Sequence, residues 1–254
     1  TGDETIYVEY EGIYTELGAT FTDNYDESGD SVVGGDTVNS SVLGTYLITY
    51  NITDSNGNEA SEIIRTVIVE DSTNPVISLT GDETIYVEYN GIYTEQGATF
   101  TDNYDMLGNV VVGGDSIDSS VLGNYSITYN LTDSSGNAAT EVIRTVIVED
   151  TTNPVITLTG DEIIYVEYGV TYNEQGATFT DNYDESGDSV VGGDIVNSSV
   201  LGTYSITYNI TDSNGNTAME VIRTVIVEDT ISPVITLTGD ETIYVEYEGI
   251  YTEL

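Results

Sequence analysis

The feature that most constrains this chain is a tandem repeat with a period of 79 residues. The stretch 146–156 reads VIVEDTTNPVI, and it recurs in nearly the same letters at residues 67–77 and 225–235. In each copy an alternating apolar run ends in Glu-Asp, crosses a short polar hinge and restarts after a proline. A unit of this length can bury its own core, whereas solenoid repeats are typically about 20–45 residues long. The repeat therefore predicts an array of small domains.

The spacing predicts four modules, two of them incomplete. They are 1–71, which lacks its first strand, 72–150, 151–229, and 230–254, which begins a further module. Residues 238–254 also reproduce residues 1–17 without a change. We therefore expect the sequence to be a segment of a longer array, with modules joined end to end by hinges too short for free flexing.

Charge and residue usage exclude several classes of partner and site. The net charge is −42, with three arginines and no lysine, histidine or cysteine. Nucleic acids and anionic membrane surfaces need Lys and Arg, so neither is expected as a partner. The absence of histidine and cysteine excludes disulfides and an ordinary zinc site. Cations are the expected ligands, although acidity of this kind also serves solubility alone.

Short alternating strands in the complete unit 72–150 predict an all-β fold. The clearest alternation places Tyr125, Ile127, Tyr129 and Leu131 on one face of a strand. Asn90-Gly91 predicts a type I′ hairpin turn, and no stretch shows a helical period with caps. About seven strands with frequent turn signals favour an antiparallel β-sandwich of the immunoglobulin type, repeated along the chain. Other strands are expected at 76–79, 85–89, 93–100, 110–112 (ended by Gly113-Gly114) and 142–149.

Several motifs recur in every complete unit and resemble a known family. They are Asn-Pro-Val-Ile-x-Leu-x-Gly, Tyr-x-Glu-x-Gly-Ala-x-Phe-Thr-Asp-Asn, Gly-x-Tyr-x-Ile-Thr-Tyr-x-x-Thr-Asp-x-x-Gly-Asn and Arg-Thr-Val-x-Val-x-Asp. This pattern resembles the bacterial Ig-like surface repeats, which also occur in some pesticidal crystal proteins and are similar to hyaline-repeat modules. The resemblance implies a secreted, non-catalytic Ig-like module and names no ligand.

Acidic residues recur at fixed places, and an immunoglobulin-type topology brings them to one end of each sandwich. With 93–100 as strand B and 125–132 as strand F, the loops 101–105 and 132–137 lie where the preceding Glu-Asp pair arrives. Oxygen ligands in this number suit Ca²⁺, which takes about six to eight at ~2.3–2.6 Å. Each aspartate taken alone favours an Asx-turn role, and only the group of them together favours a cation site. The predicted ligands are Glu70, Asp71, Asp102, Asp105 and Asp133 at one junction, and Glu149, Asp150, Asp181, Asp184 and Asp212 at the next.

The arginines and the remaining acids suggest packing rather than catalysis. Arg65, Arg144 and Arg223 stand in phase with inward-facing valines. We expect each stem to pack on a tyrosine and each guanidinium to reach a carboxylate. Paired carboxylates also occur in glycosidases, but here they recur in every module, and no serine has a histidine partner. The chain is therefore not expected to be an enzyme.

Two functions remain open from the sequence. The first is an extracellular structural fibre, stalk or filament that calcium stiffens at the junctions. The second is a cell-surface adhesin whose modules bind a glycan or a surface protein. Near-identical modules favour the first, because a recognition surface is expected to vary between modules or to occur in only one.

The outward face suggests two further features. Outward-facing Ile68, Ile147 and Ile226, with Tyr7, Tyr86 and Tyr165, allow weak lateral contacts between chains unless the module itself covers them. Six sequons allow glycan modification, although chance sequons are common in a chain so rich in Ser and Thr. They lie at Asn39, Asn51, Asn124, Asn130, Asn197 and Asn209.

Overall fold

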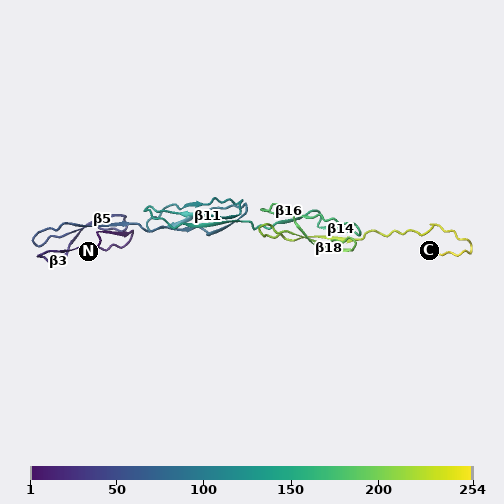
Figure 1. Cartoon of the computed structure of the whole chain (residues 1–254), viewed down its shortest axis with the longest axis horizontal. Coiled ribbons are helices and arrows are strands. Elements are labelled where there is room, and N and C mark those ends of the chain that lie inside the picture. Colours follow the sequence, from purple (N-terminus) through teal and green to yellow (C-terminus); the bar gives the residue numbers. More distant parts are fainter. Residues whose placement is uncertain (1, 253–254) are drawn as a thin grey trace. The chain divides into compact units, whose positions relative to one another are not determined.

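A computed structural model describes residues 2–252 of the chain. These residues form strands and turns without any helix, so none of them forms a helix that could cross a membrane (Figure 1). The chain divides into two compact units, residues 1–149 and 150–254, which are described separately. The repeated strands agree with the predicted all-β array of Ig-like sandwiches.

Each module contributes one set of strands. The first set is β1 (Thr5–Glu9), β2 (Thr20–Thr22), β3 (Ser28–Asp30), β4 (Val32–Gly35), β5 (Gly44–Asn51) and β6 (Ile63–Glu70). The second is β7 (Val76–Leu79), β8 (Thr84–Glu88), β9 (Ala98–Thr101), β10 (Val111–Gly114), β11 (Gly123–Asn130) and β12 (Val142–Glu149). The third is β13 (Val155–Leu158), β14 (Ile163–Glu167), β15 (Ala177–Thr180), β16 (Ser186–Asp188), β17 (Val190–Gly193), β18 (Gly202–Asn209) and β19 (Val221–Glu228).

A four-stranded sheet forms one layer of each of the first three modules. In the second module its order is β10-β11-β12-β8, and β8 joins β12 in parallel with Val87 opposite Val148. The hairpin predicted at Asn90-Gly91 is therefore wrong. Asn90 does take a positive φ of 58°, but the turn carries the chain away from β8 toward the other layer. A tight hairpin joins only antiparallel neighbours, and here the neighbour of β8 is the distant strand β12.

A smaller sheet forms the second layer. β7 pairs antiparallel with β9, with Ile77 opposite Phe100, and β13 pairs in the same way with β15. In the third module β16 extends this layer from β15, and in the first module β3 pairs with β2. The prolines before β7 and β13 stand at the start of each strand, where a missing N–H removes no ladder bond.

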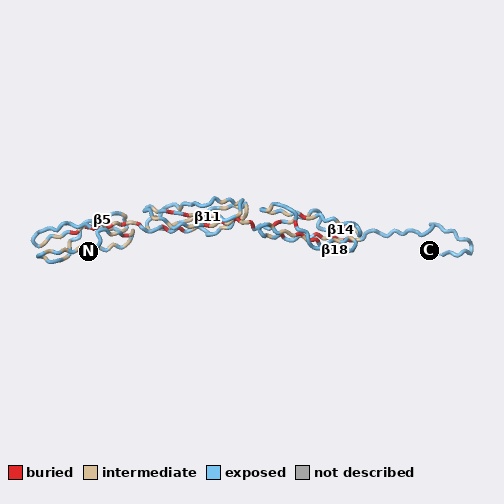
Figure 2. Tube along the Cα trace, in the orientation of Figure 1, coloured by how far each residue is buried: buried red, intermediate tan, exposed pale blue. Residues whose placement is uncertain are grey.

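The core lies between the two layers. In the second module Val146 and Tyr129 are fully buried, and Ile77 and Leu131 pack in the same cluster. Figure 2 shows buried positions interspersed among exposed ones along the chain. The face predicted for Tyr125, Ile127, Tyr129 and Leu131 is confirmed, because Ile127, Tyr129 and Leu131 are buried while Tyr125 is half-buried.

Two strand predictions need correction. Residues 93–97 are not a strand, and β9 begins only at Ala98. The glycine Gly97 takes a φ of +76°, and its N–H donates to the Glu95 carboxylate at 2.6 Å. This bond turns the chain so that the Glu95 carboxylate reaches the buried Arg144, while the Glu95 side chain stays 31% exposed. The strand predicted to end before Gly113-Gly114 includes both glycines, since Gly113 pairs with Thr128 and Gly114 with Ile127.

The exterior leaves two predictions untested. Tyr7, Tyr86 and Tyr165 are each 63% exposed, whereas Ile68, Ile147 and Ile226 are half-buried beside them in register. Lateral association therefore stays a prediction. Glycan modification also stays one. The sequon amides of Asn51, Asn130 and Asn209 donate to Glu62, Glu141 and Glu220 on the outer face, so a glycan there would replace these bonds.

Residues 230–252 form no strand and are exposed throughout (Figure 2). The further module predicted from residue 230 onward thus has its sequence pattern but no sheet among the described residues.

Candidate metal sites

Four carboxylates meet where the first module joins the second. Asp71 follows β6, Asp102 and Asp105 lie in the loop after β9, and Asp133 lies in the loop after β11. Each offers one oxygen, and these four oxygens all lie within 4.8 Å of one another. Two unit charges about 4 Å apart repel by roughly 4 kcal/mol at an effective dielectric constant of about 20. A bound cation would relieve this repulsion. The chain has no Lys or His, and Arg65, Arg144 and Arg223 pair with Glu16, Glu95 and Glu174 instead.

Backbone N–H groups hold these carboxylates in place. Asp102 Oδ2 accepts bonds from the N–H of Tyr104 and Asp105 at 3.0 and 2.8 Å. Asp133 Oδ1 accepts from the Asn137 N–H at 2.7 Å. These are the Asx-turn contacts that the sequence left open as an alternative role. In Asp102 the turn uses Oδ2 and leaves Oδ1 without a bond, whereas both oxygens of Asp133 accept bonds from Asn137 and both of Asp105 accept bonds from Ser134. Turn formation and cation binding are still compatible, because a carboxylate oxygen that accepts one hydrogen bond keeps a second lone pair.

Two of the remaining oxygens are buried without a partner. They are Asp71 Oδ2 and Asp102 Oδ1, and the whole Asp71 residue is only 6% exposed. Burial raises the pKa of Asp71, and the charges of Asp102 and Asp133 add to the rise. Buried polar atoms in folded proteins nearly always have a hydrogen-bond partner or an ion. A cation site without its ion has this arrangement, with unpaired oxygens on carboxylates that repel one another.

A related group lies in the unit 150–254. Asp150, Asp181 and Asp212 each offer an oxygen within 4.8 Å of the others, and Asp181 Oδ1 is buried without a partner. The environment of its buried aspartate differs, because Asn214 Nδ2 donates to Asp150 Oδ2 at 2.9 Å. The second module has Ser135 at the position of Asn214. The two groups therefore share a design but differ in one neutral neighbour.

Three predicted ligands do not join these groups. Glu70 and Glu149 are the last residues of β6 and β12, whose alternation directs Val69 and Asp71, and Val148 and Asp150, toward the interior. The two glutamates occupy the alternate positions of these strands, so their side chains point to the opposite face. This alternation can be read from the sequence. Asp184 accepts bonds from the Ser213 N–H at 2.6 Å and its hydroxyl at 2.8 Å, as Asp105 does from Ser134, but its oxygens do not join the Asp150 group. A third group, formed by Asp23, Asp26 and Asp54 in the first module, was not predicted.

The arginine prediction is confirmed in all three modules. Arg144 is fully buried, its Nη1 donates to Glu95 Oε1 at 2.6 Å, and its Cζ lies 5.4 Å from the centroid of the Tyr129 ring. Its other donors reach the carbonyls of Thr80 and Asp82 at 2.6 and 3.0 Å. Arg65 pairs with Glu16 over Tyr50, and Arg223 pairs with Glu174 over Tyr208.

Tyrosine hydroxyls complete this ion pair, whose arginine is fully buried and whose glutamate side chain is 31% exposed. Tyr93 and Tyr129 both donate to the Glu95 carboxylate. Burial raises the pKa of Glu95, but these bonds, the Gly97 N–H and the Arg144 charge outweigh it and hold the pKa below its usual value. Burial and the neighbouring Glu95 carboxylate raise the pKa of Tyr129. In the third module, burial and the Glu174 carboxylate raise the pKa of Tyr172 to about 12. The network thus contains an ionised glutamate and neutral tyrosines at neutral pH.

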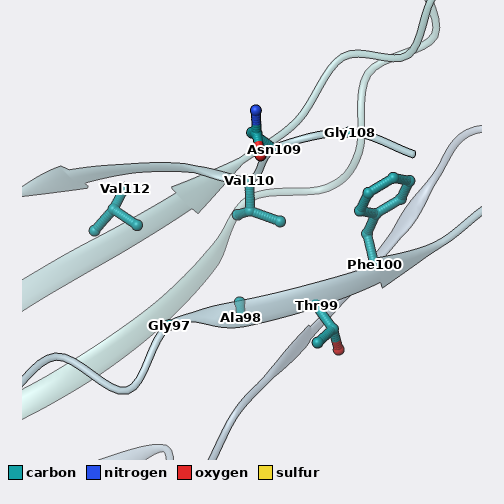
Figure 3. A pocket seen from close by; sticks show the side chains of 8 residues that line it. All are labelled: Gly97, Ala98, Thr99, Phe100, Gly108, Asn109, Val110 and Val112. Atoms are coloured by element: carbon teal, nitrogen blue, oxygen red, sulfur yellow. The ribbon is translucent and has the colours of Figure 1, made fainter.

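The second module also carries a cavity of about 420 Å³ between β9, β10 and the segment before β10 (Figure 3). In the first and third modules Ser31 and Ser189 close this edge, each donating its hydroxyl to an alanine carbonyl at 3.0 Å. Val110 stands at this position and has no hydroxyl. Beside it, Met106 and Leu107 are 79% and 91% exposed, where the other modules have Glu and Ser.

Similarity to known proteins extends over the same three modules. The model of the family described as "Bacterial surface protein, Ig-like domain" matches residues 1–69, 77–148 and 156–227. Over 219 residues the chain is 28% identical to hyalin of Strongylocentrotus purpuratus, covering 77% of this chain and 17% of that protein. It is 31% identical to hyalin of Lytechinus variegatus over 219 residues, or 78% and 39% of the two proteins.

A third relative is an uncharacterized 81.3 kDa protein of Acholeplasma phage L2, 28% identical over 216 residues that cover 78% of this chain and 28% of that protein. The chain thus spans less than two fifths of each of these curated relatives. The family model, in contrast, covers most of the chain in three tandem matches, as the sequence motifs predict. The chain belongs to the family of Ig-like domains of bacterial surface proteins.

Proposed function

We propose that the chain is part of an extracellular or cell-surface structural array in which Ca²⁺ at the module junctions stiffens a fibre, stalk or filament. The observation that carries the proposal is the Asp71 carboxylate. It is 6% exposed, its Oδ2 has no hydrogen-bond partner, and three other carboxylates surround it. A cation would satisfy the unpaired oxygens and cancel the repulsion at once.

The donor chemistry favours calcium among common cations. All candidate ligands are hard oxygens, and several carboxylates meet at one point. Mg²⁺ usually retains several waters and takes only one or two protein carboxylates, whereas Ca²⁺ accepts many carboxylate and carbonyl oxygens in a flexible geometry. Zinc prefers nitrogen and sulfur ligands, and the chain has no histidine or cysteine.

The position of the Asp71 group supports a mechanical role. Asp71 comes directly after the last strand of the first module, while Asp102, Asp105 and Asp133 belong to the second. A cation bound by all four would tie the two modules together. The family of bacterial surface proteins supports a location outside the cell, and near-identical repeats support a non-catalytic, structural role.

Solution scattering tests this role on the 254-residue chain. In millimolar Ca²⁺ we expect the profile of a stiff particle, and in excess chelator the profile of folded beads on flexible joints. Asp102→Asn with Asp133→Asn should loosen the first junction even in calcium. The matched control, Asp115→Asn, alters an exposed turn away from this group. Equal flexibility with and without calcium would rule out the stiffening role.

An adhesin is the second candidate, and the cavity of the second module is the observation that favours it. A recognition surface is expected to be confined to one module, and exposed Met106 and Leu107 beside the cavity occur only there among the three. Met106→Glu with Leu107→Ser, the residues of the first module, should reduce binding to glycan or cell-surface preparations at least tenfold. Unchanged binding, or no binding by the unmodified chain, would remove this candidate.

A further inference from the structure

One more buried acceptor without a partner lies beside the Asp71 group. It is Asn103 Oδ1, in the residue directly after Asp102. The amide nitrogen of Asn103 donates to Glu9 Oε1 at 2.8 Å. Because an amide is planar, with its oxygen and nitrogen on opposite branches, this bond directs the oxygen away from Glu9. A third unpaired oxygen therefore stands at the same junction as those of Asp71 and Asp102.

Glu9 is bound to both segments that supply the aspartates. It ends β1 of the first module, and its carboxylate accepts bonds from the Ser72 N–H at 3.0 Å and the Thr73 hydroxyl at 2.8 Å. Ser72 follows Asp71, and Asn103 follows Asp102. One side chain thus fixes the residue after each of two candidate ligands. Glu9 is not itself in the carboxylate group.

We propose that Asn103 supplies a fifth, neutral oxygen ligand to the cation at the Asp71 group, and that Glu9 of the preceding module is the positioning residue that aims it. This inference rests on the proposed calcium site. It adds to that site a ligand and a residue that act across the junction. A neutral oxygen satisfies the coordination number of Ca²⁺ without adding repulsion to a site that already holds four carboxylates.

The arrangement makes cation binding and module contact mutually dependent. Glu9 can aim Asn103 only while the two modules are docked, as they are where the Tyr10 and Tyr104 rings meet edge to face with centroids 4.9 Å apart. A cation that binds the aimed Asn103 more tightly favours the docked state by the same factor, because such coupling is reciprocal. Calcium would thereby hold the junction through a neutral side chain as well as through charge.

The third module provides a matched control. Glu167 stands at the end of β14 as Glu9 does in β1, and it accepts bonds from the Thr230 N–H at 3.0 Å and the Thr230 hydroxyl at 2.6 Å. None of the asparagines in the part of the chain that the structure describes contacts it. Glu167→Gln therefore makes the same chemical change without touching a cation ligand.

The test uses the full chain with Asp23→Asn, Asp54→Asn, Asp181→Asn and Asp212→Asn, which leaves the Asp71 group as the only complete one. Calorimetric titration with CaCl₂ then reports a single affinity. Asn103→Ala and Glu9→Gln should each weaken it about 10- to 100-fold, as loss of an outer-shell or neutral ligand does. Glu167→Gln should leave it unchanged. Melting in chelator shows that each variant is folded as the parent is.

A double substitution distinguishes a Glu9 that positions Asn103 from a Glu9 that acts only through its negative charge. If Glu9 acts by aiming Asn103, then Glu9→Gln made on top of Asn103→Ala should cost less than roughly threefold more, because the two effects are not additive. A full additional loss would overturn the positioning role, and parent-like affinity of both single variants would overturn the fifth ligand. If the parent takes up no Ca²⁺, or Asp102→Asn does not weaken uptake, the calcium site itself fails, which is a different result.

Discussion

Replacing Arg144 with methionine is expected to lower the free energy of unfolding of the second module by about 3–5 kcal/mol. Methionine keeps the apolar stem but removes the charge that compensates Glu95. It also leaves the carbonyls of Thr80 and Asp82 without their donors. Single domains are stable by only about 5–15 kcal/mol, so the loss removes a large part of the stability of a small module.

Denaturant unfolding combined with limited proteolysis measures this effect. In Arg144→Met the second module should unfold and be cleaved first. In Arg223→Met the third module should do so instead. Glu141→Gln, which changes only an exposed bond to Asn130, should cost at most about 1 kcal/mol. Adding Glu95→Gln to Arg144→Met should recover part of the loss, because no uncompensated carboxylate then remains. A cost for Arg144→Met as small as for the surface control would refute the structural role of the ion pair.

Calcium at about one hundred times its Kd is expected to stabilise the Asp71 junction and its module by about 2.7 kcal/mol. A shift of about 4–8 °C per kcal/mol is typical of domains of this size, so the melting temperature should rise by roughly 10–20 °C. The source of the gain is the removal of repulsion among four carboxylates and the pairing of Asp71 Oδ2 and Asp102 Oδ1. Scanning calorimetry in calcium and in chelator measures it.

The Asp71 and Asp150 groups are expected to differ in their affinity for calcium. Asp150 Oδ2 already accepts a bond from Asn214, whereas Asp71 Oδ2 has no partner. The Asp71 group should therefore bind more tightly than the Asp150 group. Asp71→Asn should abolish the larger part of the calcium-dependent rise in melting temperature and leave melting in chelator unchanged or higher, because it also removes repulsion.

The sequence predicted those features that follow from repeat, parity and residue chemistry. The period defined the modules, and alternation identified the buried face around Tyr129. An arginine in phase with buried valines predicted a carboxylate partner, because a buried guanidinium needs compensation. The meeting of Asp71, Asp102, Asp105 and Asp133 followed from immunoglobulin topology alone. In each case the physical constraint acts along one strand or at one end of a known fold.

Features that depend on pairing between distant strands were not predictable in the same way. Nothing in the alternation of β8 specifies a parallel partner such as β12. Glu95 lies in a segment that reads as a strand, and its inward turn depends on bonds to Gly97, Tyr129 and Arg144. Glu9 is 94 residues from Asn103, and no local pattern connects them. By contrast, strand alternation in the sequence already places Glu70 on the face opposite Asp71, which is enough to exclude it from the carboxylate group.

Direct titration of the chelator-stripped chain with Ca²⁺ tests the calcium junction most simply. We expect uptake at two or more sites per 254-residue chain at or below millimolar calcium, with the tightest site lost in Asp71→Asn and in Asp102→Asn. Asp36→Asn, which changes an exposed turn residue outside all three groups, should bind as the parent does. If the stripped chain takes up no calcium, or if uptake is the same in Asp71→Asn, the junction carboxylates are turn and solubility residues and calcium does not bridge the modules.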